Sequence, residues 1–186
     1  MNVIYGLGKA KRIFRDAVLA IGVFDGLHLG HQMLIRKTVE RAKALRCPSV
    51  VMTFFPHPVH VLHPEIPLPL IVSFSYRLKL IERLGIDTCF VIHFTKRFAK
   101  LTPERFIRRY IVDSLHAKEV FVGDDFRFGQ NRTGTLDYFK EVGEKQGFKV
   151  NIVSSSFKGI CDSSSCIYKL ALSMAPLSSL TSLNLL

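Results

Sequence analysis

The stretch VLAIGVFDGLHLGHQMLIRKTVERAKAL, residues 18–45, decides the fold class. It opens with Val18 to Val23, a short apolar run of the kind that predicts a buried strand. A glycine-rich turn follows, and from His31 onward core-type residues recur at helical spacing until Pro48 closes the segment. A strand that passes through a short turn into an amphipathic helix is the first half of a parallel βαβ unit.

The alternation of strands and helices continues along the chain. Further strands are predicted over 49–55 (SVVMTFF), 88–93, 119–122 and 149–153, and further helices over 73–84, 102–115 and 135–146. The segment between Pro56 and Pro69 carries five prolines, too many for a helix or a central strand, and is expected to be a loop. We therefore expect an α/β fold, a Rossmann-like doubly wound parallel sheet of about five strands with helices on both faces.

The composition excludes several classes of protein. A chain of 186 residues with 48% hydrophobic and 22% charged residues is not intrinsically disordered, and eight prolines and twelve glycines exclude collagen-like and low-complexity sequences. The four cysteines lack the spacing of a zinc site or a redox pair. Without a secretory signal or a convincing membrane span, the chain is expected to be soluble, cytoplasmic and without a membrane partner.

The net charge of +11, from 26 Lys and Arg against 15 Asp and Glu, predicts an anionic partner. A nucleotide, a nucleic acid and an anionic membrane surface all remain open on charge alone. The basic residues between Lys96 and Arg109 raise the alternative of a nucleic-acid-binding module. They do not form the aromatic stacking platform of an RNA-binding module, and no helix-turn-helix pattern is evident. We therefore interpret them as a solvated helix face that could help guide small anions, and we expect no nucleic-acid partner.

Two loops at the carboxyl ends of predicted strands carry chemistry, which is where ligands bind in such sheets. In the first, Gly22, Gly26 and Gly30 let the backbone approach a ligand, and a helix start at His31 would offer free N–H groups to phosphate. His28 and His31 would add imidazole donors able to neutralise charge on a pentacoordinate phosphorus. The alternative is a tight turn with two surface histidines.

The second loop follows the strand over 119–122 and carries Asp124, Asp125, Phe126 and Phe128. Its aromatic rings could pack on a planar ring of a ligand while a carboxylate accepts hydrogen bonds from the same ligand. The alternative is that the two phenylalanines anchor the loop in the core and Asp124 caps a turn. His57, held between two prolines at a strand end, is a candidate residue of the same site.

Three motifs together resemble one enzyme family. The HxGH element at His28 to His31 is the signature of the nucleotidyltransferase superfamily. Residues 53–58 (TFFPHP) and 123–129 (GDDFRFG) resemble the TFxPHP and GxDFxFG motifs of prokaryotic FAD synthetases, which are FMN adenylyltransferases usually fused to a riboflavin kinase domain. The resemblance runs from about Val18 to Val153, in order and with matching spacing.

This resemblance implies a reaction in which AMP is transferred from ATP to FMN, giving FAD and pyrophosphate, with Mg²⁺ accompanying the ATP phosphates. It implies three sets of site residues, with any metal ligands left unknown. Those expected to be catalytic are His28 and His31; those expected to bind ATP are Gly22, Phe24, Asp25, Gly30, Ser164 and Ser165; those expected to bind the flavin are His57, Asp125, Phe126 and Phe128.

The last part of the chain departs from the family pattern. We expect residues 1–157 to form the nucleotidyltransferase domain. Residues 158–186 are expected to be a Ser/Leu-rich tail with a degenerate ATP-site motif and no riboflavin kinase domain. A riboflavin kinase domain, fused or separate, is a possible partner. The family's SSTxIR segment corresponds to residues 163–168, where Ser165 stands in the threonine position and Cys166 and Tyr168 replace the family's basic residues. A nucleotide-binding homologue without efficient turnover is therefore a further alternative.

Overall fold

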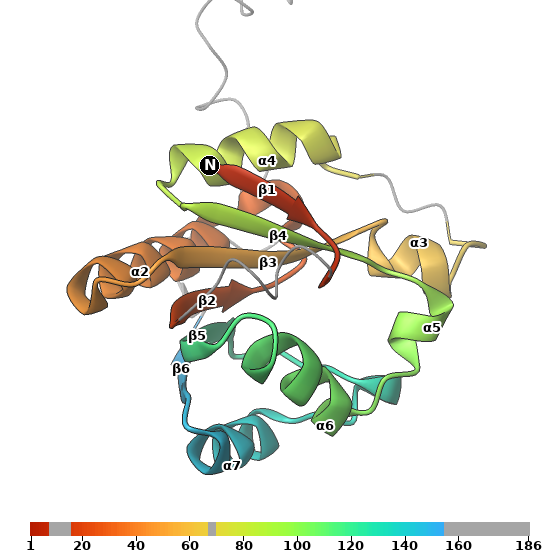
Figure 1. The fold of residues 1–186 in the computed structure, drawn as a ribbon. Helices are drawn as coiled ribbons and strands as arrows, with labels where there is room; N and C mark the ends of the chain where they lie inside the picture. The colour runs from red at the N-terminus through yellow and green to blue at the C-terminus, as the bar shows by residue number, and fades with distance from the viewer. Residues whose placement is uncertain (8–15, 67–69, 155–186) are drawn as a thin grey trace, which may run out of the picture. The chain divides into compact units, whose positions relative to one another are not determined.

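A single parallel sheet of six strands organises the protein (Figure 1). The structure, a computed structural model, describes residues 1–7, 16–66 and 70–154. The strand order is β1-β4-β3-β2-β5-β6. The strands are β1 (Asn2–Tyr5), β2 (Ala17–Ile21), β3 (Ser49–Phe55), β4 (Thr88–His93), β5 (Ala117–Gly123) and β6 (Lys149–Val153).

Strand β2 lies at the middle of the sheet, and all five of its residues are buried. It pairs in parallel with β3, with Val18 opposite Ser49, and with β5, with Leu19 opposite Val120. A strand buried on both faces needs apolar side chains at every position rather than at alternate ones, which is the pattern of AVLAI.

Helices and short turns connect the strands and cover the sheet. The helices are α2 (Leu29–Leu45), α3 (Pro58–Leu62), α4 (Phe74–Arg83), α5 (Lys96–Ala99), α6 (Pro103–Phe106) and α7 (Leu136–Gln146). Helix α6 continues into the π-helical turn η2 (Ile107–Val112), and the short turns η1 (Asp25–Leu27) and η3 (Gln130–Arg132) lie in loops.

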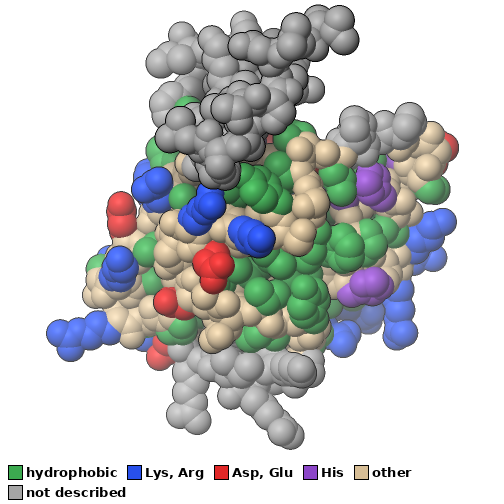
Figure 2. Space-filling model, turned by 90° about the horizontal axis from the view of Figure 1, so that it is seen from above, with side chains coloured by type: hydrophobic (Ala, Val, Ile, Leu, Met, Phe, Trp, Pro, Cys, Tyr) green, Lys and Arg blue, Asp and Glu red, His purple; other side chains and the backbone are tan. Residues whose placement is uncertain are grey.

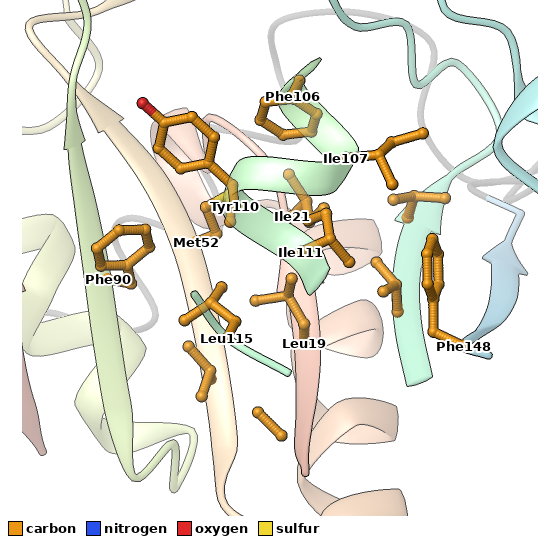
Figure 3. Packing of buried hydrophobic residues seen from close by; sticks show 14 of the residues in the cluster. Leu19, Ile21, Met52, Phe90, Phe106, Ile107, Tyr110, Ile111, Leu115 and Phe148 are labelled. Atoms are coloured by element: carbon orange, nitrogen blue, oxygen red, sulfur yellow. The ribbon is translucent and has the colours of Figure 1, made fainter. Parts of the chain in front are cut away.

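The core lies between the sheet and the helices of one face (Figure 3). Leu19, Ile21 and Met52 of the sheet pack there against Phe106 and Ile111 of α6 and η2. The neighbouring strand residues point to the opposite face, which is covered by α2 and α4 through buried residues including Ile35, Val39, Leu80 and Ile81. The prediction of an α/β parallel sheet with helices on both faces is confirmed.

Three details of the prediction are wrong. The sheet has a sixth strand, β1, which is short, lies at the edge and buries only Ile4, so it leaves almost no pattern to detect. The proline-rich segment contains helix α3, because Pro58 stands at its first position, where proline is tolerated. Helix α2 begins at Leu29 rather than His31, since His28 is its N-cap.

The strand order reverses beside β2. From β2 the chain builds outward through β3 to β4, and it then returns to place β5 on the other side of β2. The loops that follow β2 and β5 therefore diverge at the carboxyl edge of the sheet and leave a crevice between them.

By its internal contacts the chain divides after Ser155 into two units, residues 1–155 and 156–186. The second unit lies outside the described residues. The boundary expected near Phe157 and the predicted ATP-binding residues Ser164 and Ser165 lie outside them as well.

Figure 2 looks onto the molecule from above, the side on which α4 and β1 lie in Figure 1. Hydrophobic side chains gather on this face, with histidine, Lys, Arg, Asp and Glu side chains scattered among them (Figure 2). Among the described residues, large hydrophobic side chains that are exposed include Phe55, Leu62, Ile66 and Ile71, which lie on or beside α3 and its flanking segments.

Candidate active site

A cavity of about 1100 Å³ occupies the crevice where the strand order reverses. This volume is at the upper end of the range for small-molecule sites. The loop after β2 contributes His28, Gly30 and His31 to its wall, and the loop after β5 contributes residues 123–132. The two loops singled out in the sequence therefore face one cavity.

The loop after β2 is shaped around the ring of Phe24. This residue has left-handed backbone angles (φ 55°, ψ 34°), and its side chain is fully buried. A Cβ at Gly22 would stand 2.9 Å from the tip of that ring, closer than side-chain carbons approach, so only glycine fits beside it. Gly22 and Phe24 thus define the loop's conformation, and both also line the cavity.

The carbonyl of Val23, just before Phe24, accepts two hydrogen bonds. The hydroxyl of Thr53 in β3 donates to it at 3.0 Å, and Nη1 of Arg77 in α4 donates at 2.9 Å. Sequence analysis missed Arg77: on an amphipathic helix an arginine ordinarily indicates the solvent face, and nothing local marks this one as buried.

His28 and His31 lie together at the amino end of α2. Their rings stack with centroids 3.6 Å apart, and the ring of Phe24 meets His31 edge-on at 5.2 Å. Nδ1 of His28 accepts a hydrogen bond from the His31 backbone N–H at 3.4 Å, which makes His28 the N-cap. An acceptor Nδ1 leaves the proton on Nε2, so His28 can donate a hydrogen bond while uncharged.

Both imidazoles favour the neutral form. Desolvation, the neighbouring His28 and the Arg77 charge together lower the pKa of His31 to about 3. Partial desolvation also lowers the pKa of His28, although the Asp125 carboxylate opposes that change. Nδ1 of His31 is buried and has no hydrogen-bond partner among the described residues.

Neither His57 nor Asp25 is among the described residues that line the cavity. His57 caps α3, because its Nδ1 accepts from the Val59 N–H at 3.2 Å. Desolvation lowers the pKa of His57, while the Asp25 charge opposes that change. Asp25 turns toward Arg77, with Oδ1 3.9 Å from Nη2. The predicted ATP-binding role of Asp25 and flavin-binding role of His57 stay predictions.

The loop after β5 presents one partly buried ring and one buried ring. Phe128 belongs to the core and packs against Phe106 and Phe139, with ring centroids 5.5 and 5.0 Å away. Phe126 stacks on Phe128 at 5.4 Å and is only partly buried. Asp125 is exposed at the cavity wall. Phe128 therefore anchors the loop while it also lines the cavity, and the predicted flavin-binding roles of Asp125, Phe126 and Phe128 stay predictions.

Exposed cations also line the cavity: Lys96 and Lys100 on and after α5, and Arg127 and Arg132 in and after the β5 loop. The two lysines belong to the stretch interpreted as a solvated helix face, and they are exposed as that interpretation expects. The two arginines were not singled out from the sequence, although Arg127 stands inside the motif over 123–129.

Within the described ranges, no group of three or more His, Cys, Asp or Glu side chains is placed to hold a metal ion. No helix in that part of the chain is long and apolar enough to span a membrane.

Comparison with known proteins agrees with these motifs. A family model described as FAD synthetase matches residues 10–165. Proteins named bifunctional riboflavin kinase/FMN adenylyltransferase are similar over most of this chain. The one from Buchnera aphidicola subsp. Schizaphis graminum is 34% identical over 155 residues, which are 83% of this chain and 50% of that protein. The one from Pseudomonas fluorescens is 35% identical over 150 residues, which are 81% of this chain and 48% of that protein. The chain spans about half the length of the curated relatives it matches.

Solved structures show the same fold. A crystal structure titled macrolide-efflux protein, from Streptococcus pneumoniae, matches with a TM-score of 0.71 and 29% identity, covering 88% of this chain and 55% of that one. A pantothenate synthetase from Thermus thermophilus matches with a TM-score of 0.50 and 13% identity, over 83% of this chain and 61% of that one, which shows the fold alone. Because the FAD synthetase model covers most of the chain, including all three motifs around the cavity, this protein is a member of the FAD synthetase family.

Proposed function

We propose that this chain transfers AMP from ATP to FMN, forming FAD and pyrophosphate. The observation that carries the proposal is the stacked His28–His31 pair at the amino end of α2, facing the β5 loop across one cavity. The family match and the names of the relatives support adenylylation of FMN. The riboflavin kinase activity in those names is said of the longer relatives.

The proposed reaction is a single in-line displacement. An oxygen of the FMN phosphate attacks the α-phosphorus of ATP, a new P–O bond forms, and the bond to the β-phosphate oxygen breaks, releasing pyrophosphate. No side chain needs to act as a nucleophile, because FMN supplies the attacking oxygen. ATP would enter as its Mg²⁺ complex, so the ion belongs to the substrate.

The chain's own contribution is positioning and charge stabilisation. Nε2–H of His28 is free to donate to a phosphate oxygen, since Nδ1 is occupied by the helix cap. The amino end of α2 adds a positive dipole, which favours an anion at the same place. Gly22 and Gly30 keep the cradle open to the phosphates, as part of the proposed ATP-binding set.

The proposed flavin side is the opposite wall. Phe126 offers a partly buried ring beside the cavity, and the Asp125 carboxylate can accept hydrogen bonds from ribityl hydroxyls. His57 would approach from the end of β3. This division of the cavity places the phosphates between the two loops, where the reacting groups must meet.

The test is product analysis by chromatography after incubation with Mg²⁺–ATP and FMN. Formation of FAD and pyrophosphate in equal amounts supports the proposal. A matched incubation measures binding of a mixed-sequence oligonucleotide over a salt titration. Tight oligonucleotide binding with a steep salt dependence, and no FAD formed, would instead favour a nucleic-acid-binding protein.

A further inference from the structure

Arg77 is the most voluminous of the fully buried side chains in the described part of the chain. It stands in α4, outside the three sequence motifs, and is 1% exposed. Removing a guanidinium from water costs several kcal/mol unless charges and acceptors compensate. A cation retained at such a place calls for a physical reason.

The polar contacts of the Arg77 guanidinium are made to one segment, the loop after β2. Nη1 donates to the Val23 carbonyl at 2.9 Å, and Nη2 stands 3.9 Å from Oδ1 of Asp25. The guanidinium carbon also lies 5.4 Å from the centre of the Phe74 ring. Nε of Arg77 and Oδ1 of Asp25 are buried without a hydrogen bond among the described residues. The hydrogen bond and the ion pair of the buried cation are thus both made to this loop.

The loop transmits this contact to the histidine pair. Val23 immediately precedes Phe24, whose left-handed backbone and buried ring permit little movement. The Phe24 ring touches His31 edge-on, and His31 stacks on His28. A displacement of the Val23 carbonyl would move Phe24, and His31 would lose the surface against which it rests.

The same cation acts electrostatically on two of the three motif histidines, His31 and His57, whose pKa values are lowered chiefly by desolvation. The Arg77 charge lowers both pKa values further, and the two histidines come from different loops. Arg77 thus lies within electrostatic reach of two of the motif segments while belonging to neither.

We propose that Arg77 is a positioning residue for adenylyl transfer: by holding Val23 and Asp25 it fixes the loop on which Phe24, His28 and His31 are arranged. The inference rests on the proposed function for its kinetic consequence. Arg77 itself touches no reacting atom, so its effect passes through the loop.

The test compares Arg77→Lys, Arg77→Met and the control Arg83→Met, which alters an exposed arginine of the same helix. We expect both Arg77 variants to lower kcat for FAD formation by about tenfold or more, with KM for ATP and FMN changed by less than about threefold, since small misplacements of catalytic groups are costly. Arg83→Met should match the wild type. Thr53→Val removes the other donor to the Val23 carbonyl and should also lower kcat. This variant tests the same contact if an Arg77 variant does not fold.

Imidazole NMR adds a readout that does not depend on turnover. The His31 titration should move to higher pH in Arg77→Met and stay in place in Arg77→Lys, which keeps the charge and loses the planar fork. A lowered kcat in Arg77→Lys with an unmoved His31 titration would show that geometry is what Arg77 supplies. If Arg77→Lys and Thr53→Val both fold and both keep the wild-type kcat, Arg77 is not a positioning residue. If the wild type forms no FAD, the proposed function fails, and the NMR titration with the loop's backbone shifts still decides whether Arg77 holds the loop.

Discussion

At the scale of single residues, the site depends on imidazoles that are kept neutral and directed by backbone contacts. His28 and His57 each accept a backbone N–H at Nδ1 and thereby cap a helix. Each therefore carries its remaining proton on Nε2, which leaves a neutral donor facing away from its helix. A neutral donor can bind phosphate without first taking up a proton, so His28 would be suited to bind phosphate at neutral pH.

Substituting His28 or His31 by alanine should lower the rate of FAD formation by about 10²-fold or more, because a lost charge-stabilising contact costs a few kcal/mol in the transition state. The fold should persist, as judged by circular dichroism. His93→Ala, at the exposed end of β4, is the control and should retain the wild-type rate. Full activity in both His28→Ala and His31→Ala would refute the assigned roles.

The depressed pKa of His31 has a consequence for stability. The folded state binds a proton there only near pH 3, whereas an unfolded histidine binds one near pH 6.5. Between these values the unfolded state holds more protons, so the free energy of unfolding should fall as pH drops, by up to ~1.4 kcal/mol per pH unit from this group. Urea unfolding between pH 7 and pH 4 measures this decline. It should be shallower in His31→Gln, and parallel declines in both proteins would contradict the burial argument.

At the scale of elements, the loop between β2 and α2 carries most of the site. Its conformation depends on the contact between Gly22 and the Phe24 ring and on the two donors to the Val23 carbonyl. These contacts come from β3 and α4 as well as from the loop itself. The loop is therefore held from three sides, which suits a segment that must present two imidazoles at fixed positions.

Gly22→Ala should disturb this loop. The added methyl group would stand 2.9 Å from the Phe24 ring, and the ring or the backbone must shift. We expect kcat/KM to fall by about tenfold or more. Thr135→Ala is the matched control: it removes the N-cap of α7, costs about 1 kcal/mol of stability, and leaves the cavity unchanged. Equal kcat/KM in the two variants would mean that the Gly22 contact is unimportant for the site.

The elements that sequence predicts well are those with a clear period or an apolar run. Strands β2 to β6 and helices α2, α4 and α7 carry these signals, and the motif loops follow from the places where strands end. Strand β1 has four residues with one buried, and α3 depends on a proline at its first position. Arg77 could not be predicted as buried because its partners are a carbonyl and a carboxylate far away in the sequence.

At the scale of the whole molecule, part of the excess positive charge lies around the cavity. Four exposed cations, Lys96, Lys100, Arg127 and Arg132, line the cavity that would receive two anionic substrates. Clefts lined by charge of one sign attract ligands of the opposite sign and accelerate association. The net charge of +11 predicts an anionic partner, and only the fold shows which cations surround the cavity.

Association should therefore depend on ionic strength. Raising the salt concentration from about 0.05 to about 0.5 M shortens the screening length to a few ångströms and should lower kcat/KM for ATP several-fold. The double variant Lys96→Gln/Lys100→Gln should have a lower kcat/KM at low salt and a weaker salt dependence. Lys37→Gln/Lys43→Gln, on the exposed side of α2, is the control. A salt dependence unchanged by the loss of Lys96 and Lys100 would rule out their part in attraction.

The central claim is that the cavity between the β2 and β5 loops joins AMP to FMN. Its most direct test is incubation of the protein with FMN and ATP carrying a radioactive label at either the α- or the γ-phosphate, followed by separation of FAD, FMN and pyrophosphate. We expect the α-label in FAD and the γ-label in pyrophosphate. No α-label in FAD would contradict the claim.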